Sequence, residues 1–399
     1  MLVLVDGQLT VAQEMNEVRW VRCHAASVED SWLCGYPNYV GSCRACPTGQ
    51  NEGVQSKPWR PLPEVLADAT AGEHASAGLA ELVYAAVARY VPFNFACFAL
   101  TDPATALVTW ASKTRSLGVG DEEFAAVEYG PPDVNSFAEI AGRTTPVGVL
   151  SVDTDGDLMR CRRHRDLMSP QFGFTDELRV VFPSRGVTWG IMALYRAGDD
   201  PRFTVDDARE VGAISAIVGA AIARTLFRPA PHHITSDAPA QAVLIIDATN
   251  HVTHLTASAE HAVQELGGFD HGSLPANILS VVAATRTRGT NTETVVHTPG
   301  GSWLTLRAAP LTGPTGDNDT VVTVEPTPRT ALGRVALAAY GLTSREEDVA
   351  LLVLQGASTH AIADTLHLSP HTVQDHLKKI FAKAGVTSRR DLTARLALH

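Results

Sequence analysis

Residues 368–377 read Leu-Ser-Pro-His-Thr-Val-Gln-Asp-His-Leu, and this run contains the clearest helix start in the chain. Ser369 can cap the free backbone N–H groups of a first helical turn, and Pro370 fits the first position because it has no N–H. Apolar residues then recur at helical spacing, at Val373, Leu377, Ile380, Phe381 and Ala384. Polar and basic residues fall on the opposite face, at His371, Gln374, Asp375, Lys378, Lys379 and Lys383. The run therefore predicts a helix with one buried stripe and one exposed polar face.

Cap signals on both sides of this run predict three more helices, which makes residues 342–399 an all-α domain of four helices. Thr343 can cap a helix that stops at Gly356, and Ser358 or Thr359 can cap a second, short helix. A last helix is expected to begin near Ser388. A short helix, a tight turn and a longer helix with a polar face form a helix-turn-helix, whose second helix has the right size for the DNA major groove.

The distribution of charge agrees with this interpretation. The chain has 399 residues and a formal net charge of −11, which argues against a protein that coats nucleic acid or an anionic membrane along its whole length. Residues 342–399 alone are not acidic, with seven Lys and Arg against six Asp and Glu. We therefore expect a polyanionic partner to bind at this end, and the low charge predicts that one copy alone binds weakly.

The same residues resemble the LuxR/GerE type of helix-turn-helix. The resemblance covers nearly all of residues 342–399 and is carried by Leu342-Thr343-Ser344-Arg345-Glu346, Gly356-Ala357-Ser358-Thr359, Ile362-Ala363, the run 368–377, Phe381-Ala382-Lys383-Ala384-Gly385-Val386 and Ser388-Arg389. It implies a bacterial transcription regulator of the actinobacterial type that binds double-stranded DNA. Two copies on a two-fold operator are expected, and RNA polymerase is a further candidate partner.

The resemblance also implies roles for individual residues. Base reading falls on Gln374, Asp375 and Lys378, which can pair with adenine, cytosine and guanine respectively. Phosphate contacts fall on Thr359, Ser369, Thr372, Lys379, Ser388 and Arg389. The sequence departs from the family at Gln374, where a basic residue is common. It departs again at Ala361, where glutamate usually completes the capping box that Ser358 opens.

Two α+β domains are expected in front of the helix-turn-helix. Residues 74–228 show a helix, paired strands, a long irregular middle, a hairpin over Ser184-Arg185-Gly186 and a final helix over 205–227. Residues 242–326 show strands and hairpins around a helix over 258–266. Residues 229–241 and 327–341 are expected linkers. The small residues of 211–227 suit either a dimer seam or a buried core helix.

The first of these domains is similar to GAF-like sensor domains, on the residues Pro146-Val147-Gly148-Val149-Leu150-Ser151, Asp176-Glu177-Leu178-Arg179 and Trp189-Gly190. The other domain resembles a degenerate PAS-like domain. These resemblances imply that each domain has a sheet over a cavity. Such domains either bind a small molecule, as expected for the GAF-like domain, or pair with a second copy of the chain. The identity of any cofactor-binding residue stays unknown, and no cofactor is expected. His251, His254 and His261 are more readily explained as unliganded histidines than as cofactor ligands.

Residues 1–73 are expected to be a poorly ordered or cysteine-containing extension. Cys43 and Cys46 have the two-residue gap of a zinc knuckle, and Cys23 and Cys34 are candidates to complete it. The spacing fits no established zinc pattern, so spare thiols are favoured and no metal is expected. Cys97 is expected to be a plain core residue.

No catalytic constellation is recognisable, so we expect a protein that is not an enzyme. The basic run Arg160, Arg162, Arg163, His164 and Arg165 is expected to form a solvated face, with an anion contact as the alternative. The longest small and apolar run, 211–223, is shorter than the roughly 20 residues that span a bilayer. We therefore expect a soluble, cytoplasmic protein. The competing function is an adaptor whose last helices dock a protein partner, and the salt dependence of binding separates the two.

Overall fold

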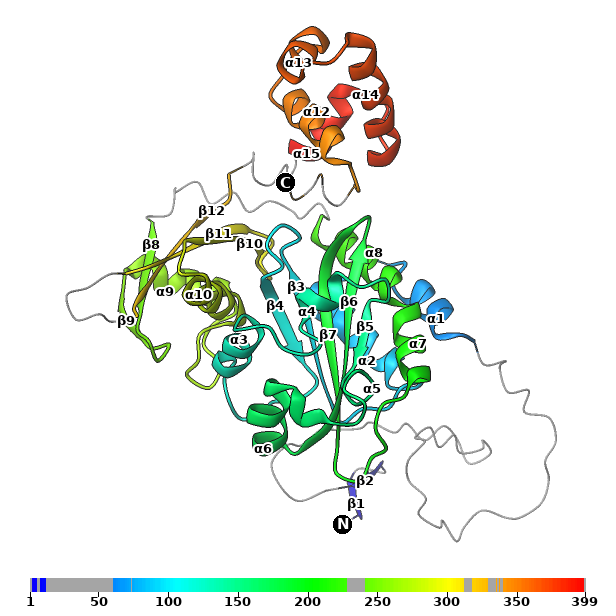
Figure 1. Cartoon of the computed structure of the whole chain (residues 1–399), viewed down its shortest axis with the longest axis vertical. Coiled ribbons are helices and arrows are strands. Elements are labelled where there is room, and N and C mark those ends of the chain that lie inside the picture. The colour runs from blue at the N-terminus through cyan, green and yellow to red at the C-terminus, as the bar shows by residue number, and fades with distance from the viewer. Residues whose placement is uncertain are drawn as a thin grey trace, which may run out of the picture. The chain divides into compact units, whose positions relative to one another are not determined.

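The computed structural model (Figure 1) describes residues 2–5, 8–11, 60–72, 74–227, 241–311, 318–328, 335, 337 and 340–397. The chain forms two units, Met1–Pro58 and Trp59–His399. In the first unit, strands β1 (Leu2–Val5) and β2 (Gln8–Val11) pair antiparallel. Within the second unit we name residues 60–227 the first domain, 241–328 the second domain and 340–397 the C-terminal domain. Nearly all of the expected linker 229–241, most of the expected linker 327–341 and the cysteines at 23, 34, 43 and 46 lie outside the described residues.

The first domain is built on an antiparallel five-stranded sheet in the order β4-β3-β7-β6-β5. Its strands are β3 (Phe95–Thr101), β4 (Val108–Lys113), β5 (Val147–Val149), β6 (Phe174–Ser184) and β7 (Val187–Ala197). The hairpins β3–β4 and β6–β7 confirm the predicted strand pairs. Because side chains alternate along a strand, Phe98 and Leu100 enter one core while Cys97 and Ala99 face the other side of the sheet.

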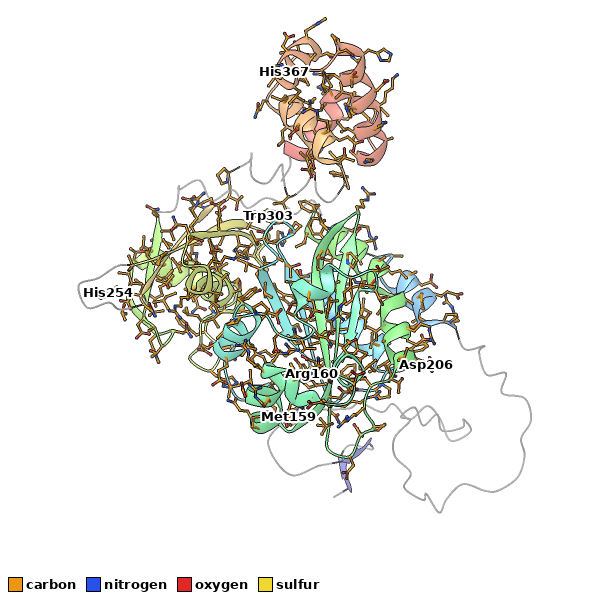
Figure 2. The ribbon with its side chains drawn as sticks, viewed as in Figure 1. Met159, Arg160, Asp206, His254, Trp303 and His367 are labelled. Atoms are coloured by element: carbon orange, nitrogen blue, oxygen red, sulfur yellow. The ribbon has the colours of Figure 1, made fainter. Side chains whose placement is uncertain are left out.

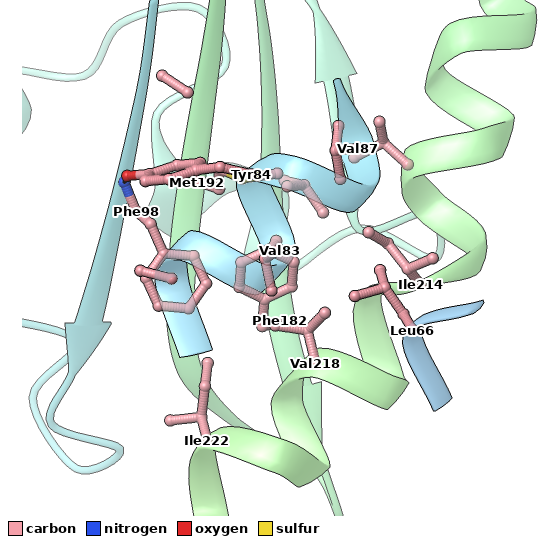
Figure 3. Packing of buried hydrophobic residues seen from close by; sticks show 14 of the residues in the cluster. Leu66, Val83, Tyr84, Val87, Phe98, Phe182, Met192, Ile214, Val218 and Ile222 are labelled. Atoms are coloured by element: carbon pink, nitrogen blue, oxygen red, sulfur yellow. The ribbon is translucent and has the colours of Figure 1, made fainter. Parts of the chain in front are cut away.

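Four helices cover the first face of this sheet, and their packing is shown in Figure 3. They are α1 (Leu62–Ala69), α2 (Ser76–Val87), α7 (Val205–Ala213) and α8 (Ser215–Leu226). Leu66 and Val83 are fully buried beside Phe182 of the sheet. The expectation that residues 1–73 form only a loose extension is therefore wrong for α1, because its apolar side chains complete the core of the first domain.

The long helix expected over 205–227 is two helices that meet at Ile214. Helix α8 lies on the sheet so closely that a Cβ added at Gly219 would come within 2.4 Å of the Pro183 carbonyl oxygen. The side chains of Val218 and Ile222 are fully buried in the same core (Figure 3). The small residues of this segment thus serve close packing inside one chain, which supports the core-helix alternative.

Shorter elements lie on the other side of the sheet, within the segment that the sequence suggested to be irregular. They are α3 (Glu122–Glu128), α4 (Phe137–Ala141), α5 (Leu150–Asp153), the 3-10 turn η1 (Leu158–Arg160), the π-turn η2 (His164–Met168) and α6 (Ser169–Phe172). These elements leave part of the sheet open to the second domain.

The second domain carries an antiparallel five-stranded sheet in the order β10-β11-β12-β8-β9. Its elements are β8 (Ala242–Ile246), β9 (Val252–Leu255), α9 (Ala257–Glu265), α10 (Ala276–Arg288), β10 (Thr292–His297), β11 (Trp303–Pro310) and β12 (Thr320–Pro326). Helix α10 was not predicted from the sequence. This helix contacts its own sheet and also β4 and α3 of the first domain, so two domains share it (Figure 1).

The C-terminal domain has the predicted four helices, α12 (Ser344–Leu354), α13 (Thr359–Leu366), α14 (Pro370–Ala384) and α15 (Arg389–Ala397). They enclose a separate core that includes Val349, Ile362, Val373 and Ile380, all fully buried. Among the described residues of the whole chain, no helix is both long enough and apolar enough to span a bilayer.

Candidate nucleic-acid interface

Side-chain caps set the start of each helix in the C-terminal domain. The Thr343 hydroxyl accepts from the backbone N–H of Glu346, whose carboxylate accepts in return from the N–H of Thr343. The Ser369 hydroxyl accepts from the N–H of Thr372 at 3.0 Å and so starts α14, as predicted. The Ser358 hydroxyl caps α13 by accepting from Ala361, whose methyl group cannot return the bond. The capping box of α13 is therefore half formed.

A three-residue turn separates α13 from α14. His367 (Figure 2) ends α13 with a left-handed backbone, φ 51°. The N–H of Leu368 then donates to the Ala363 carbonyl at 2.8 Å, which closes the turn. Ser369 immediately caps the next helix, so the chain changes direction within a few residues. This geometry gives α14 a fixed direction relative to α13.

The outer face of α14 presents polar side chains on a rigid support. Gln374, Lys378 and Lys379 are exposed, and Asp375 is half-buried beside them. The Asp375 carboxylate lies 3.5 Å from Nζ of Lys378 and 3.4 Å from Nδ1 of His371. Such exposed pairs contribute little to stability, about 0–1 kcal/mol, so they can exchange for contacts to a ligand.

Thr359 joins this face to the start of α15. Nη2 of Arg389 donates to Oγ1 of Thr359 at 2.9 Å, and Nη1 donates to the Ala357 carbonyl at 2.8 Å. Nε2 of Gln374 donates to the same Thr359 oxygen at 3.4 Å. The first turn of α13, the second turn of α14 and the first turn of α15 therefore meet at one hydroxyl group.

Lys383 does not belong to the exposed polar face, contrary to the sequence prediction. Its Nζ donates to Oε2 of Glu346 at 2.6 Å and to the Gly341 carbonyl at 3.0 Å, which ties α14 to the start of α12. Burial raises the pKa of the Glu346 carboxyl, but the bonds from Lys383 and Thr343 outweigh it and hold the pKa below its usual value. The basic charge available to a partner on α14 is therefore that of Lys378 and Lys379.

The arrangement suits a ligand that carries regularly spaced negative charges. The first turns of α13, α14 and α15 each present backbone N–H groups, which attract anions together with the helix dipole. The exposed face of α14 adds hydrogen-bond donors and acceptors that can read the edges of bases. Groups suited to contact phosphates and groups suited to contact base edges thus lie on neighbouring parts of one surface.

Comparison with known proteins assigns this domain. Residues 341–396 match the family described as "Bacterial regulatory proteins, luxR family". Residues 341–396 are a LuxR-family helix-turn-helix domain. The match covers only this part of the chain.

Two curated relatives are similar over the LuxR-family domain alone. One is named putative HTH-type transcriptional regulator, from Mycobacterium bovis, and is 46% identical over 56 residues, which are 14% of this chain and 6% of that protein. The other is the monoamine regulon transcriptional regulator of Klebsiella aerogenes, 43% identical over 54 residues, 14% of this chain and 24% of that protein. The chain thus matches well under a third of either relative. A crystal structure of Escherichia coli SdiA aligns with 84% of this chain and 95% of that one, at 8% identity and a TM-score of 0.33.

The LuxR-family domain brings the predicted site residues onto adjoining turns. The predicted base readers Gln374, Asp375 and Lys378 all lie on the outer part of α14. Most of the predicted phosphate contacts lie at helix starts: Thr359, Thr372 and Arg389 in the first turns of α13, α14 and α15, and Ser369 and Ser388 immediately before α14 and α15. Lys379 is exposed beside the base readers. Nδ1 of His376 is buried without a hydrogen-bond partner in the described part of the chain.

The three histidines that were weighed as cofactor ligands lie in the second domain. His251, His254 (Figure 2) and His261 are all exposed at the surface of the second domain. In the described parts of the chain, no group of three or more His, Cys, Asp or Glu residues is arranged to hold a metal ion.

The basic run 160–165 is not the uniformly solvated face that the sequence suggested. Arg163 is 3% exposed and pairs with Glu177 at 2.5 Å. Glu177 also accepts from Nε of Arg179 at 2.8 Å, and burial raises its pKa, but the two guanidinium groups prevail and lower it to about 2. Arg165, by contrast, pairs with its neighbour Asp166 at the surface. The partner of Arg163 lies on β6, so sequence proximity alone gave no sign of this buried network.

Proposed function

We propose that this chain is a sequence-specific DNA-binding transcription regulator. In the proposed complex α14 enters the major groove, with Gln374, Asp375 and Lys378 at base edges. Thr359, Ser369, Thr372, Lys379, Ser388 and Arg389 hold the phosphates. The protein binds a two-fold operator as a homodimer, because the domain carries too little positive charge for one copy to bind tightly.

The observation that carries the proposal is the meeting of Gln374 and Arg389 at the hydroxyl of Thr359. Gln374, a predicted base reader on α14, bonds directly to Thr359 on α13, which in turn accepts from Arg389 on α15. Because Thr359 and Arg389 are both predicted phosphate contacts, this arrangement supports the proposal. A helix that reads bases has to be oriented by phosphate contacts on either side of it. The match of residues 341–396 to the LuxR family supports the same conclusion.

The front domains are proposed to control the spacing or availability of two such helices. In this proposal the first domain is a GAF-like sensor domain that binds a small molecule, and the second is a PAS-like domain. A small molecule changes DNA binding only if its affinity differs between the two arrangements of the dimer. RNA polymerase is the proposed partner once the operator is occupied.

Selection of DNA fragments by the purified full-length chain tests the proposal. The expected result is an enriched motif with two-fold symmetry, whose binding weakens steeply as salt rises. Lys378→Ala should change the preferred base at one position of each half-site, and Arg209→Ala serves as the matched control, since Arg209 is an exposed cation on α7. The selection is run both with and without the small molecules of a cell extract. If neither run enriched any sequence, the proposal would be overturned and the protein-docking adaptor would be favoured.

A further inference from the structure

A cavity lies between the sheet of the first domain and helix α10 of the second. It has a volume of about 110 Å³. Its lining includes Ala111 on β4, Phe137 on α4 and both Ala276 and Ser280 on α10. Two domains therefore build its wall, and neither the LuxR-family match nor the proposed DNA contacts involve it.

The floor of the cavity exists because the sheet presents small side chains there. Cys97 and Ala99 on β3 stand in register with Ala193 on β7 and Ala111 on β4 respectively. The opposite face of the same strands carries Phe98 and Leu100, which fill the other core. Large side chains therefore pack on one face of these strands, while the small side chains on the other face leave a local hollow.

The walls are mostly apolar and aromatic. Aromatic rings surround the small-residue floor, namely Phe95, Phe124, Tyr129, Phe137 and Tyr195. Hydrocarbon cavities of about 150 Å³ in protein interiors bind benzene. The cavity here is somewhat smaller than that, so its volume and lining limit a ligand to a single six-membered ring with at most a small substituent.

The charged groups around the cavity are already paired with one another. Lys113 pairs with Asp121 at 2.6 Å, Arg179 with Glu128 at 2.7 Å, and Arg163 with Glu177. A charged ligand would lose its hydration without gaining an unpaired counter-charge, which is costly in such a site. The remaining polar atom on the floor is the Cys97 thiol, and burial raises its pKa to about 12, so it stays neutral.

Helix α10 is fixed to the first domain by hydrogen bonds beside the cavity. Oγ of Ser280 donates to the Val108 carbonyl at 2.8 Å, and Nδ2 of Asn277 donates to the Thr109 carbonyl at 3.2 Å. Both acceptors lie on β4. A molecule in the cavity would touch the sheet and the helix together and would strengthen their association.

We propose that this cavity binds a neutral compound with a single aromatic ring, and that the bound ring holds the first and second domains together. The inference deepens the proposed function, because it names the class of molecule to which the front domains respond, and it rests on that function only for the effect on DNA. Binding to the cavity itself can be measured with no DNA present.

Calorimetric titration of the full chain with phenol, and with benzoate as a charged ring of similar size, tests the proposal. Phenol should bind, and benzoate should bind at least about tenfold more weakly, because its charge finds no free counter-ion. Two variants fill the cavity from opposite domains, Ala111→Leu from β4 and Ala276→Leu from α10. Each should weaken phenol at least about tenfold, since the added side chain occupies the ring's volume.

Ala216→Leu, on an exposed position of α8, is the matched control and should leave phenol binding unchanged. Circular dichroism and thermal unfolding establish that each variant is folded. Hydrogen exchange should show that phenol protects amides of α10 as well as those of β3 and β7. No phenol binding, stronger binding of benzoate, or loss of binding in Ala111→Leu alone would each overturn the proposal. A failure of DNA selection would leave these outcomes unaffected.

Discussion

The carboxylate of Asp102, in the β3–β4 turn of the first domain, accepts a 3.0 Å hydrogen bond from the hydroxyl of Thr294 on β10 of the second. The same Oδ2 atom accepts from the backbone N–H of Val295 at 3.1 Å, while Oδ1 accepts from Ala104 within the turn. Strand β10 lies at the edge of its sheet, so this carboxylate satisfies an edge N–H that no strand can pair. Asp102 is 4% exposed and thus clamps two domains from a buried position.

Asp102→Ala is expected to destabilise the contact between the front domains. The variant leaves the Val295 N–H without its partner, at a cost of about 1–3 kcal/mol. Urea unfolding and hydrogen exchange at Val295 measure the effect. Asp102→Asn is the control, because its amide oxygen can still accept one bond, and it should lose less. Equal stability of Asp102→Ala and the unmodified chain would contradict the role of this clamp.

Gly219→Ala is expected to destabilise the first domain by about 1–3 kcal/mol, because the new methyl group would meet the Pro183 carbonyl at 2.4 Å and force α8 away from β6. Gly78 provides a matched control, since it is exposed in α2 and an added Cβ meets nothing within 4 Å. Gly78→Ala should stabilise by up to about 1 kcal/mol through helix propensity. Thermal unfolding of both variants should therefore give shifts of opposite sign.

Glu346 should make the stability of the C-terminal domain sensitive to acid. Its pKa is lower in the folded domain than in the unfolded chain, so its contribution is present above the unfolded pKa of about 4.5 and is lost as pH falls through the folded value. Glu346→Gln should cost about 1.5–3 kcal/mol at neutral pH, by weakening the bonds to Lys383 and Thr343. Unfolding of the domain between pH 3 and 7, followed by circular dichroism, measures both effects.

The control for Glu346 is Asp364→Asn, an exposed carboxylate on α13. This substitution should leave the acid dependence unchanged. If Glu346→Gln kept the full loss of stability on acidification, another carboxylate would have to be responsible.

Lys379→Ala is expected to weaken DNA binding on every sequence by a similar factor. Removing one phosphate contact should reduce the slope of log affinity against log salt by about 0.9. The selected motif should stay the same, in contrast to Lys378→Ala, which removes a base contact. Fluorescence anisotropy at several salt concentrations separates the two. An altered motif in Lys379→Ala would contradict the assignment of Lys379 to a phosphate contact and of Lys378 to a base contact.

The helix starts could be predicted from sequence wherever a local chemical signal marks them. Ser369 with Pro370, and Thr343 with Glu346, specify caps through residues only one to three positions apart. Helix α10 carries no such signal. Eight of its residues are buried, so the helix is covered on nearly all sides. Its apolar residues therefore show no amphipathic period. The buried partner of Arg163 and the cavity between Ala111 and Ala276 depend on segments far apart in sequence, which only the fold brings together.

The sharing of α10 sets the unit in which these domains can be exchanged between proteins. A chimaera joined within residues 229–241 would separate β4 from the helix that covers it, and would expose the apolar floor of the first domain. A junction after Thr327 keeps both sheets, α10 and the Asp102 clamp in one piece. Although the first and second domains have two separate sheets, we expect them to be transferable between proteins only as a single part.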